Sequence, residues 1–387
     1  MAMKGDGGMK VFVIIHTTTP GGVQRVGTYE VYWFRRLGYD ATLLAIFKSK
    51  VKEWDLFQKL GVKPIYLSRN EAFGRAVYPL LLNLMSITVD DTIPDAIFAH
   101  NIPGGQVYLS IKKRYTKRIP LILYLHDPLV YPISGSFYAI CASRIPSITL
   151  RLEESLIQEA SIVLTNSKKT LVKLLRIHKN KNNVGLQDKI RILYPTLNTP
   201  IAENEIKKDR KNYLLTVGRI DHEAFLNLYR IMKNIDLPLI IAGSYHPYNA
   251  DALRIIRLYN DLRSKGKNIK FIFFPSDDVL LELYKNACLF VYSGHENFNM
   301  SAIEAMSAGC PILVANTSGV CEILPKSLRE YICLPKDRID LWVNRILEIV
   351  RNDESYRLGK ECWRITLRYN INTHMSKLVN VLREVAE

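Results

Sequence analysis

The 387-residue sequence lacks several features that would define its class at once. No CxxC pair, the spacing typical of zinc sites and dithiol redox centres, occurs among its six cysteines, Cys141, Cys288, Cys310, Cys321, Cys333 and Cys362. Several of them lie in apolar runs, as in a reduced, intracellular chain rather than a disulfide scaffold. No segment approaches the roughly 20 apolar residues of a membrane-spanning helix, and the polar start MAMKGDGG has no signal core. We therefore expect a cytoplasmic protein.

Acidic residues are too few to balance the basic ones, and the excess lies in one half of the chain. The formal net charge is +16; residues 1–200 carry 27 Lys and Arg against 14 Asp and Glu, whereas residues 201–387 carry 26 against 23. A basic first half suits an anionic partner such as phospholipid headgroups, which would allow peripheral contact with an anionic membrane, and an ordinary solvated surface is the alternative. Nucleic acid is a further alternative, but no recognisable nucleic-acid-reading motif supports it.

The first half also lacks a dinucleotide-binding fingerprint. Residues 10–16 (KVFVIIH) form a predicted buried strand, 23–37 a helix and 41–47 a second strand, which together make a βαβ unit. Its first loop, TTTPGGVQR, has no GxGxxG pattern. Helical spacing predicts that one stripe of the helix faces the sheet: Val26, Tyr29, Trp33 and Leu37.

Polar residues follow three further predicted strands, at 96–99, 121–125 and 162–165. The pairs that follow them are His100–Asn101, His126–Asp127 and Asn166–Ser167. Because parallel strands end at one edge of a sheet, these side chains should share the rim at which α/β domains bind ligands. The basic segment 168–181 is predicted to be an amphipathic helix whose apolar face packs on the core, with a membrane-facing edge as the alternative.

A second alternation of strands and helices follows an aperiodic, charged segment that we assign as the linker, residues 199–211. The predicted strands are 213–217, 239–242, 269–274 and 289–292, and the predicted helices are 224–234, 250–265 and 278–286. Two successive α/β domains, each with a polar rim, imply a ligand cleft between them.

The stretch 289–324 holds the most informative pattern. A buried strand is followed by the polar loop 293–299, a short helix, Gly309 and a second buried strand at 312–315. The helix can begin after Asn299, or after Ser301 as a capping box with Glu304. Together with Glu296, this loop at a helix start is where an anionic ligand would bind.

The motifs of the chain resemble one known family. Glu296 and Glu304 stand eight positions apart, Glu304 opens the run EAMSAGCPILVAN, and VGRID occupies 217–221. With PGGVQR near the start and His126 after an apolar strand, this set resembles the retaining GT-B glycosyltransferases of family four. The resemblance implies two Rossmann-like domains: an acceptor domain at 9–198 and a donor domain at 212–365, with a C-terminal helical segment at 366–387 packing back on the first domain.

The resemblance also implies roles for particular residues. Glu296 and His126 would contact the transferred sugar, and Glu304 the nucleotide ribose. The donor diphosphate would meet Arg219, the amides around Asn299, Met300 and Ser301, and the turn formed by Gly21 and Gly22. Phe274 and Pro275 would pack on the base. For His126 a purely structural place in the core is an equal alternative, and for Arg219 the alternative is an ion pair with Asp221.

Four positions depart from the family pattern. Asn297 and Asn299 replace the glycines around Phe298, and asparagine tolerates left-handed backbone better than most residues, so we expect the loop to keep its shape. Where the family has a lysine and a glycine, this chain has Ala224 and Phe225. Loss of a cation near the leaving diphosphate weakens transition-state stabilisation unless another cation replaces it. We therefore expect a retaining, metal-independent hexosyltransferase that uses a UDP- or GDP-linked sugar, without a cofactor, and acts on a glycan or lipid-linked acceptor. A catalytically silent, nucleotide-sugar-binding subunit is the alternative.

Overall fold

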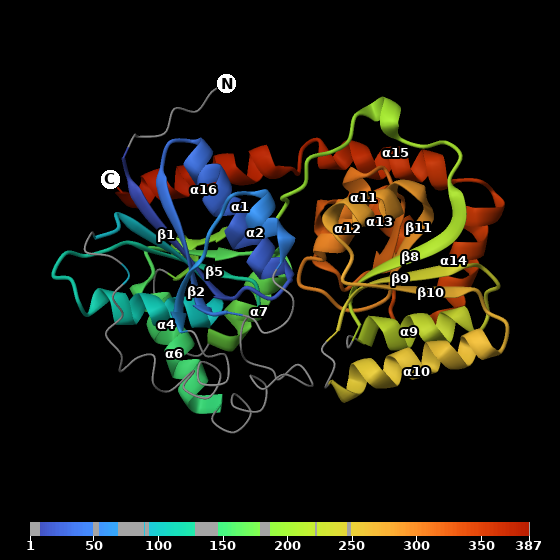
Figure 1. Cartoon of the computed structure of the whole chain (residues 1–387), viewed down its shortest axis with the longest axis horizontal. Coiled ribbons are helices and arrows are strands. Elements are labelled where there is room, and N and C mark those ends of the chain that lie inside the picture. Colours follow the sequence, from blue (N-terminus) through green and yellow to red (C-terminus); the bar gives the residue numbers. More distant parts are fainter. Residues whose placement is uncertain are drawn as a thin grey trace. The chain divides into compact units, whose positions relative to one another are not determined.

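The computed structural model describes residues 8–48, 54–68, 89, 93–127, 146–178, 186–220, 223–245 and 249–386. The chain divides into two compact units (Figure 1). The first comprises residues 1–195 with 374–387, and the second comprises 196–373. The division falls just before the segment 199–211 that we assigned as the linker, and the last fourteen residues rejoin the first unit.

The first unit is built on a seven-stranded parallel sheet in the order β3-β2-β1-β4-β5-β6-β7. Its strands are β1 (Lys10–Thr17), β2 (Asp40–Phe47), β3 (Ile65–Ser68), β4 (Ala96–His100), β5 (Leu121–Leu125), β6 (Ile162–Thr165) and β7 (Ile190–Ile192). The helices are α1 (Gly22–Arg36), α2 (Asp55–Lys59), α4 (Asn101–Lys112), α6 (Pro146–Glu159), α7 (Lys168–His178), α8 (Leu186–Lys189) and, from the C-terminus, α16 (Ile371–Ala386). The order reverses between β1 and β4, which creates a topological switch point.

The second unit repeats this topology with six parallel strands in the order β10-β9-β8-β11-β12-β13. The strands are β8 (Lys211–Arg219), β9 (Leu239–Ser244), β10 (Ile269–Phe273), β11 (Ala287–Tyr292), β12 (Ile312–Ala315) and β13 (Cys333–Leu334). The helices are η2 (Glu203–Glu205), α9 (Glu223–Met232), α10 (Ala250–Ser264), α11 (Asp277–Asn286), α12 (Met300–Ser307), η3 (Gly319–Ile323), α13 (Lys326–Ile332), α14 (Ile339–Arg351) and α15 (Ser355–Thr366). Its switch point lies between β8 and β11.

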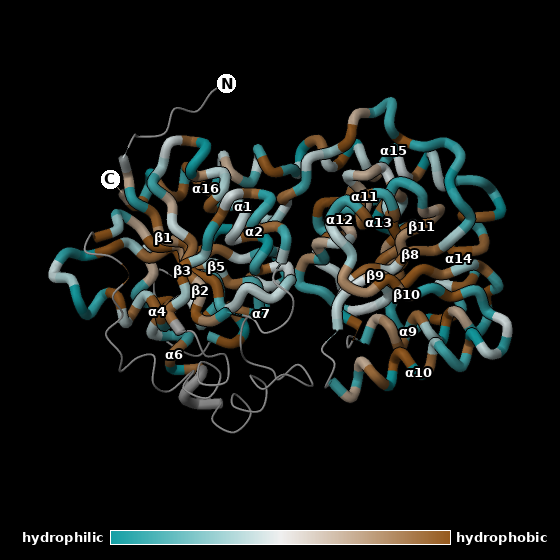
Figure 2. Tube along the Cα trace, in the orientation of Figure 1, coloured by the Kyte–Doolittle hydropathy of each residue, from teal (hydrophilic) through white to brown (hydrophobic). Residues whose placement is uncertain are grey.

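Both sheets are covered on their two faces, so their strands consist of almost continuous apolar residues (Figure 2). Every residue of β4, β5, β6, β11 and β12 is buried. The predicted fold class, two parallel α/β domains, is confirmed. The sequence did not predict β3, β7 and β13, which are short strands at the sheet edges and lack the continuous apolar runs of the central strands.

The predicted buried stripe of α1 is wrong apart from its first residue. Tyr29, Trp33 and Leu37 are only half-buried, whereas Glu30 and Phe34 are fully buried with Val26. The helix presents the face of positions 26, 30 and 34 to the sheet, and a carboxylate lies in the middle of that face. A pattern search excludes this face because it treats glutamate as a surface residue.

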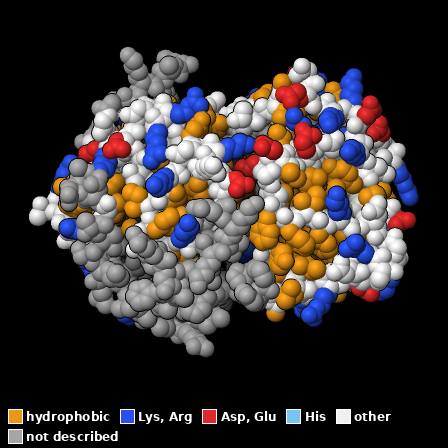
Figure 3. Space-filling view, viewed as in Figure 1, with side chains coloured by type: hydrophobic (Ala, Val, Ile, Leu, Met, Phe, Trp, Pro, Cys, Tyr) orange, Lys and Arg blue, Asp and Glu red, His pale blue; other side chains and the backbone are white. Residues whose placement is uncertain are grey.

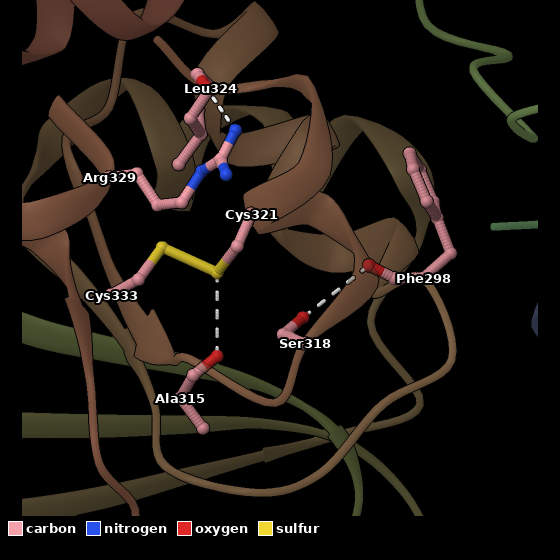
Figure 4. Close-up of a disulfide and its surroundings, with 7 residues drawn as sticks. All are labelled: Phe298, Ala315, Ser318, Cys321, Leu324, Arg329 and Cys333. Carbon is pink, nitrogen blue, oxygen red and sulfur yellow. Dashed lines mark hydrogen bonds between the residues drawn. A yellow bond between two sulfur atoms is a disulfide. The ribbon is translucent and has the colours of Figure 1, made fainter. Parts of the chain in front are cut away.

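The fully reduced state predicted for the cysteines is also wrong. Cys321 in η3 and Cys333 at the start of β13 form a disulfide (Figure 4). Strand pairing brings them together, because β13 aligns Cys333 with Val314 of β12 while Cys321 Sγ lies 3.5 Å from Ala315 O. The remaining cysteines within the described ranges are buried thiols: Cys288, Cys310 and Cys362.

Among the described residues, no helix is both long enough and apolar enough to cross a membrane. On the face drawn in Figure 3, Lys and Arg side chains are spread among uncoloured and hydrophobic ones rather than gathered in one patch. The predicted amphipathic helix is confirmed as α7, which buries Thr170, Leu174 and His178. Residues 179–181 of that prediction, like Asp221, lie outside the described residues.

Candidate active site

The second unit places its candidate residues at the carboxyl ends of the two strands that flank the switch point. Arg219 ends β8, and the loop that carries Glu296 follows the neighbouring strand β11. In open parallel sheets this crevice is where ligands bind. The sequence pattern predicted a polar loop with Glu296 after a buried strand, whereas Arg219 was assigned from the resemblance of VGRID to the family's phosphate loop.

Tyr292, the last residue of β11, connects these two groups. Its hydroxyl donates a hydrogen bond of 2.6 Å to Glu296 Oε1. Burial raises the pKa of Tyr292 well above its ordinary value, the Glu296 carboxylate raises it further, and the nearby Arg219 charge opposes them. Tyr292 therefore stays protonated and orients the Glu296 carboxylate. Sequence reasoning counted Tyr292 only as part of a buried strand. Its position four residues before Glu296 was the feature that could have indicated this role.

Helix α12 begins after Asn299, which resolves the two alternatives for its first turn. Asn299 has φ = 76°, and its side-chain oxygen accepts a hydrogen bond from Ala302 N at 3.0 Å. The capping box of Ser301 with Glu304 is therefore not formed. The left-handed backbone that asparagine tolerates is confirmed at this position. Asn299 Nδ2 is buried and has no hydrogen-bond partner among the described residues, so a donor stands at the helix start beside the amides of Met300 and Ser301.

Glu304 lies one turn further along α12 and is half-buried. Tyr284, from α11, places its hydroxyl 3.3 Å from Glu304 Oε2. The contact with Tyr284 therefore fixes the Glu304 carboxylate where α11 packs against α12. Glu296 lies on the loop before α12.

The start of η3 supports the loop that carries Glu296 through backbone hydrogen bonds. Gly319 N donates to Glu296 O at 3.1 Å, and Val320 N donates to Phe298 O at 2.8 Å. A Cβ on Gly319 would stand 1.9 Å from Asn297 O, so only glycine permits this approach. The disulfide between Cys321 and Cys333 ties the middle of η3 to β13 (Figure 4).

Ala224 and Phe225, which replace the family's lysine and glycine, pack inside the second unit. Ala224 is buried, and its carbonyl accepts a hydrogen bond of 2.9 Å from Ser293 Oγ at the start of the loop. Phe225 is fully buried, and its carbonyl accepts from Tyr259 Oη at 2.8 Å. A cation nevertheless lies near Ala224. Lys336 Nζ is 3.5 Å from Oε2 of Glu223, the residue that precedes Ala224.

The sequence predicted Phe274 as the last residue of a strand, but it lies one residue beyond β10. It adopts φ = 50°, and its amide donates to Gly243 O at 2.9 Å. The Phe274 ring centroid lies 5.8 Å from that of Tyr245, and Phe273, which is 40% exposed, lies 4.9 Å from Tyr245. Pro275 follows, and Ser276 caps α11. The turn exposes aromatic surface at the end of the strand.

The first unit brings the predicted polar strand ends together, as expected. Asn101 Oδ1 accepts the amide of His126 at 2.8 Å, and Asn166 Nδ2 donates to the carbonyl of His126 at 3.0 Å. The backbone of His126 is thus held from both neighbouring strands. Its imidazole Nε2 lies 3.0 Å from Nδ1 of His100, which in turn reaches Glu30. Sequence reasoning singled out neither Glu30 nor His100 as a partner of this ring.

Gly21 and Gly22 open α1 at the end of β1. Gly21 is the N-cap in extended backbone, and its carbonyl accepts from Arg25 N at 3.0 Å. Gly22 is exposed, and Arg25 lies over the ring of Trp54 at 4.9 Å. This turn and His126 lie at the ends of strands separated only by β4. Among the described residues, no group of three or more His, Cys, Asp or Glu side chains could hold a metal ion.

The fold resembles that of solved two-domain α/β structures. Sucrose-phosphate synthase from Thermosynechococcus elongatus superposes with a TM-score of 0.73 and 15% identity, over 97% of this chain and 99% of that one. HepE from Anabaena, solved in complex with UDP and glucose, superposes with a TM-score of 0.70 and 16% identity, over 97% and 100%. At these identities the likeness establishes the fold, which is the GT-B class that the sequence predicted.

The family follows from the sequence of the second unit. Residues 198–361 match the family model described as glycosyl transferases group 1, so the chain carries a group 1 glycosyltransferase domain. This domain contains Arg219, Glu296, Asn299 and Glu304. The match agrees with the glycosyltransferase motifs identified in this half of the chain, and retention stays a prediction.

Curated relatives agree with this assignment. An uncharacterized glycosyltransferase of Methanocaldococcus jannaschii is 28% identical over 182 residues, 43% of this chain and 45% of that protein. The human alpha-1,3/1,6-mannosyltransferase ALG2 is 23% identical over 210 residues, 48% of this chain and 49% of that protein. The serotype-specific mannosyltransferase WbdA of Escherichia coli is 30% identical over 31% of this chain and 14% of that protein. The chain spans about half the length, or less, of these relatives.

Proposed function

We propose that this protein transfers a hexose from a UDP- or GDP-linked sugar to a hydroxyl of a glycan or lipid-linked acceptor, with retention of the anomeric configuration. The observation that carries the proposal is the arrangement around Glu296. Its carboxylate is oriented by Tyr292 at 2.6 Å and lies beside Arg219, before a helix start at which Asn299 Nδ2 has no partner within the described part of the chain. These groups belong to a group 1 glycosyltransferase domain.

The chemistry needs a stabilised leaving diphosphate and a held sugar. Arg219 and the amides at the start of α12 would donate hydrogen bonds to the phosphate oxygens, and the positive end of the helix would favour their charge. Glu296 would accept hydrogen bonds from the sugar hydroxyls, and Glu304 from the ribose. The turn at Phe274 and Pro275, beside the exposed ring of Phe273, would pack on the base.

Retention without a covalent intermediate is the mechanism we favour. The acceptor hydroxyl would attack the anomeric carbon from the face that the diphosphate leaves, and a leaving phosphate oxygen would take the proton of that hydroxyl. Cationic and amide donors supply the stabilisation that this route requires, so we propose that the reaction proceeds without a metal ion. Lys336 would supply the charge that Ala224 does not by exchanging its ion pair with Glu223 for the diphosphate.

The relatives guide the choice of substrates. ALG2 and WbdA are named as mannosyltransferases, and HepE was solved with UDP and glucose. GDP-mannose and UDP-glucose are therefore the first donors to test. Peripheral contact of the first unit, which holds most of the excess positive charge, with an anionic membrane stays a prediction. Sedimentation with anionic liposomes at low salt tests it, and no binding there would remove it.

Substitution at Glu296 tests the proposal. Each nucleotide sugar is first screened for a rise in melting temperature, and the donor so found is used in a transfer or donor-hydrolysis assay. Glu296→Gln should reduce turnover by at least about 100-fold while leaving the melting temperature of the free protein within a few degrees. Glu330→Gln, on the exposed face of α13, is the matched control and should keep wild-type turnover.

The outcomes separate the candidate functions. Undiminished turnover of Glu296→Gln would refute the site. A wild-type protein that is stabilised by a nucleotide sugar but neither transfers nor hydrolyses it would instead be a nucleotide-sugar-binding subunit, which the buried Ala224 makes the second candidate.

A further inference from the structure

Glu223, the first residue of α9, joins a cation to the loop that carries Glu296. Its Oε1 accepts a hydrogen bond of 3.2 Å from the backbone amide of His295, the residue before Glu296. Its Oε2 lies 3.5 Å from Nζ of Lys336, which belongs to the segment between β13 and α14. One carboxylate therefore connects α9, the loop before α12 and that segment. We call the two charged residues the Glu223–Lys336 pair.

Buried hydrogen bonds keep Glu223 beside the loop. Ser293 Oγ donates to Ala224 O at 2.9 Å, and Asn227 Nδ2 donates to Ser293 O at 3.3 Å. Ser293 is 0% exposed and Asn227 8% exposed, so little water competes for these bonds. The first turn of α9 is thus joined to the start of the loop, and the Glu223 carboxylate is held next to the amide of His295.

The pair lies among the residues of the candidate active site. Burial raises the pKa of Tyr292, and the Glu296 and Glu223 carboxylates raise it further. The Arg219 charge opposes them. Since electrostatic effects fall off with distance, all three charges lie near the same hydroxyl. The second unit therefore sets two carboxylates, Glu223 and Glu296, against two cations, Arg219 and Lys336.

Lys336 combines a fixed backbone with a side chain that has room to turn. Trp342 is fully buried, and its Nε1 donates to Pro335 O at 2.9 Å, which fixes the chain just before Lys336. The Lys336 and Glu223 side chains are 34% and 45% exposed. An ion pair this exposed contributes little, because water screens both charges. The ammonium on its flexible stem can therefore exchange Glu223 for a stronger anion at small cost.

We propose that Glu223 competes with the nucleotide diphosphate for Lys336. It gives up Lys336 when the nucleotide sugar binds, and it takes Lys336 back when the nucleoside diphosphate leaves after transfer. The inference rests on the proposed function and adds a role in product release. Throughout, Oε1 of Glu223 keeps the amide of His295. Glu223 is thus a positioning residue that acts through Lys336: it keeps the cation at the site and lowers the affinity for the leaving product.

Binding of the product alone measures this competition without turnover. The full-length protein is titrated with UDP and with GDP by isothermal titration calorimetry near 0.15 M salt, and the nucleotide that binds the wild type is used for the variants. Lys336→Met removes the cation and should weaken binding at least about fivefold. Glu223→Gln keeps an amide oxygen for His295 but not the charge that holds Lys336, so it should tighten binding about threefold.

The opposite signs separate competition from support of the fold. A pair that only stabilises the loop would weaken binding in both variants, and that result would overturn the proposal. An unchanged Kd for Lys336→Met would overturn it as well. The melting temperature of each free variant should stay within a few degrees of the wild type, since both side chains are exposed.

A double variant separates competition from simple repulsion. When Lys336→Met is already present, adding Glu223→Gln should change the Kd by less than about 1.5-fold, because no cation remains to be released. Repulsion between exposed charges is weak at this salt concentration. An equal gain in both backgrounds would show that Glu223 merely repels the ligand, and it would overturn the proposal.

The Lys326–Glu330 pair of α13 is the matched control. It lies in the same unit at 3.9 Å with both groups exposed. Lys326→Met and Glu330→Gln make the same changes of net charge, and each should leave the Kd within about 1.5-fold of wild type. Shifts equal to those of the Glu223–Lys336 variants would assign the effect to net charge and overturn the proposal.

Product inhibition supplies a second readout. With the donor that the wild type turns over, Glu223→Gln should lower the inhibition constant of the nucleoside diphosphate about threefold, in line with its Kd. An inhibition constant that stays at the wild-type value would overturn the role in product release. A wild type that binds neither UDP nor GDP would remove the proposed function and this inference with it. Normal binding that is insensitive to both substitutions would remove this inference alone.

Discussion

Replacing Gly319 with alanine should disable the donor loop through one steric contact. The added Cβ would lie 1.9 Å from Asn297 O and 3.0 Å from Phe298 Cα, both backbone atoms of the loop. Since real Cβ atoms do not approach other heavy atoms within 3.0 Å, the loop or η3 must withdraw by about 1 Å. Glu296 and the start of α12 move with the loop, because Gly319 N and Val320 N hold its carbonyls.

The expected magnitudes follow from this displacement. Overpacking of a tight backbone contact should lower the free energy of unfolding by about 1–3 kcal/mol. A misplacement of about 1 Å at a reacting centre costs about 100-fold in rate. Gly319→Ala should therefore lose about 100-fold in turnover and most of the rise in melting temperature that the donor sugar produces, while it remains folded at 25 °C.

A matched glycine tests whether the loss is local. Gly359 of α15 approaches Gly309 O, beyond the C-terminal end of α12, where a Cβ would stand 2.1 Å away. Gly359→Ala should destabilise the protein to a similar degree in urea unfolding but keep donor binding and turnover within about threefold of wild type. Wild-type turnover in a folded Gly319→Ala, or equal losses in both variants, would refute the assignment of the donor site to the loop before α12.

Three further predictions concern stability and the site. The pKa of Glu30 lies at about 2 instead of 4.5. Between these pH values the unfolded chain therefore binds a proton that the native chain does not. Up to about 3 kcal/mol of the free energy of unfolding, present above pH 4.5, should be lost as the pH falls toward 2. Urea unfolding at stepped pH checks this, and Glu30→Gln should flatten the curve in that range. Tyr292→Phe removes the hydroxyl that orients Glu296 and should lower kcat about tenfold at unchanged fold, as judged by circular dichroism; an unchanged kcat would show that Glu296 needs no such support. Cys321→Ser removes the bond to Cys333 and should lower the free energy of unfolding by about 2–3 kcal/mol. It should also abolish the effect of dithiothreitol on the melting temperature. An equal effect of dithiothreitol on the wild type and the variant would argue against the disulfide.

Much of the architecture follows from local pattern. Continuous apolar runs of four to eight residues between helical segments predict parallel strands covered on both faces, and the runs at 121–125, 162–165 and 312–315 coincide with β5, β6 and β12. Asn299 illustrates the same point at one residue. Its tolerance of left-handed backbone and its capping oxygen are properties of the side chain itself, so the loop shape could be predicted without a partner.

Pairings across long stretches of chain were decided only by the tertiary structure. Glu30 lies 70 residues from His100 and 344 from His374, and Cys321 meets Cys333 because β13 pairs with β12. On its own, a glutamate in an amphipathic helix predicts an exposed side chain, since burying a lone carboxylate costs several kcal/mol. Only the fold, by placing two imidazoles against the carboxylate, makes the buried position favourable. The sequence by itself therefore determined the two α/β domains, their polar rims and the loop of Glu296. The tertiary structure decided which buried partners orient His126 and Glu296, because those energies exist only once distant segments are in contact.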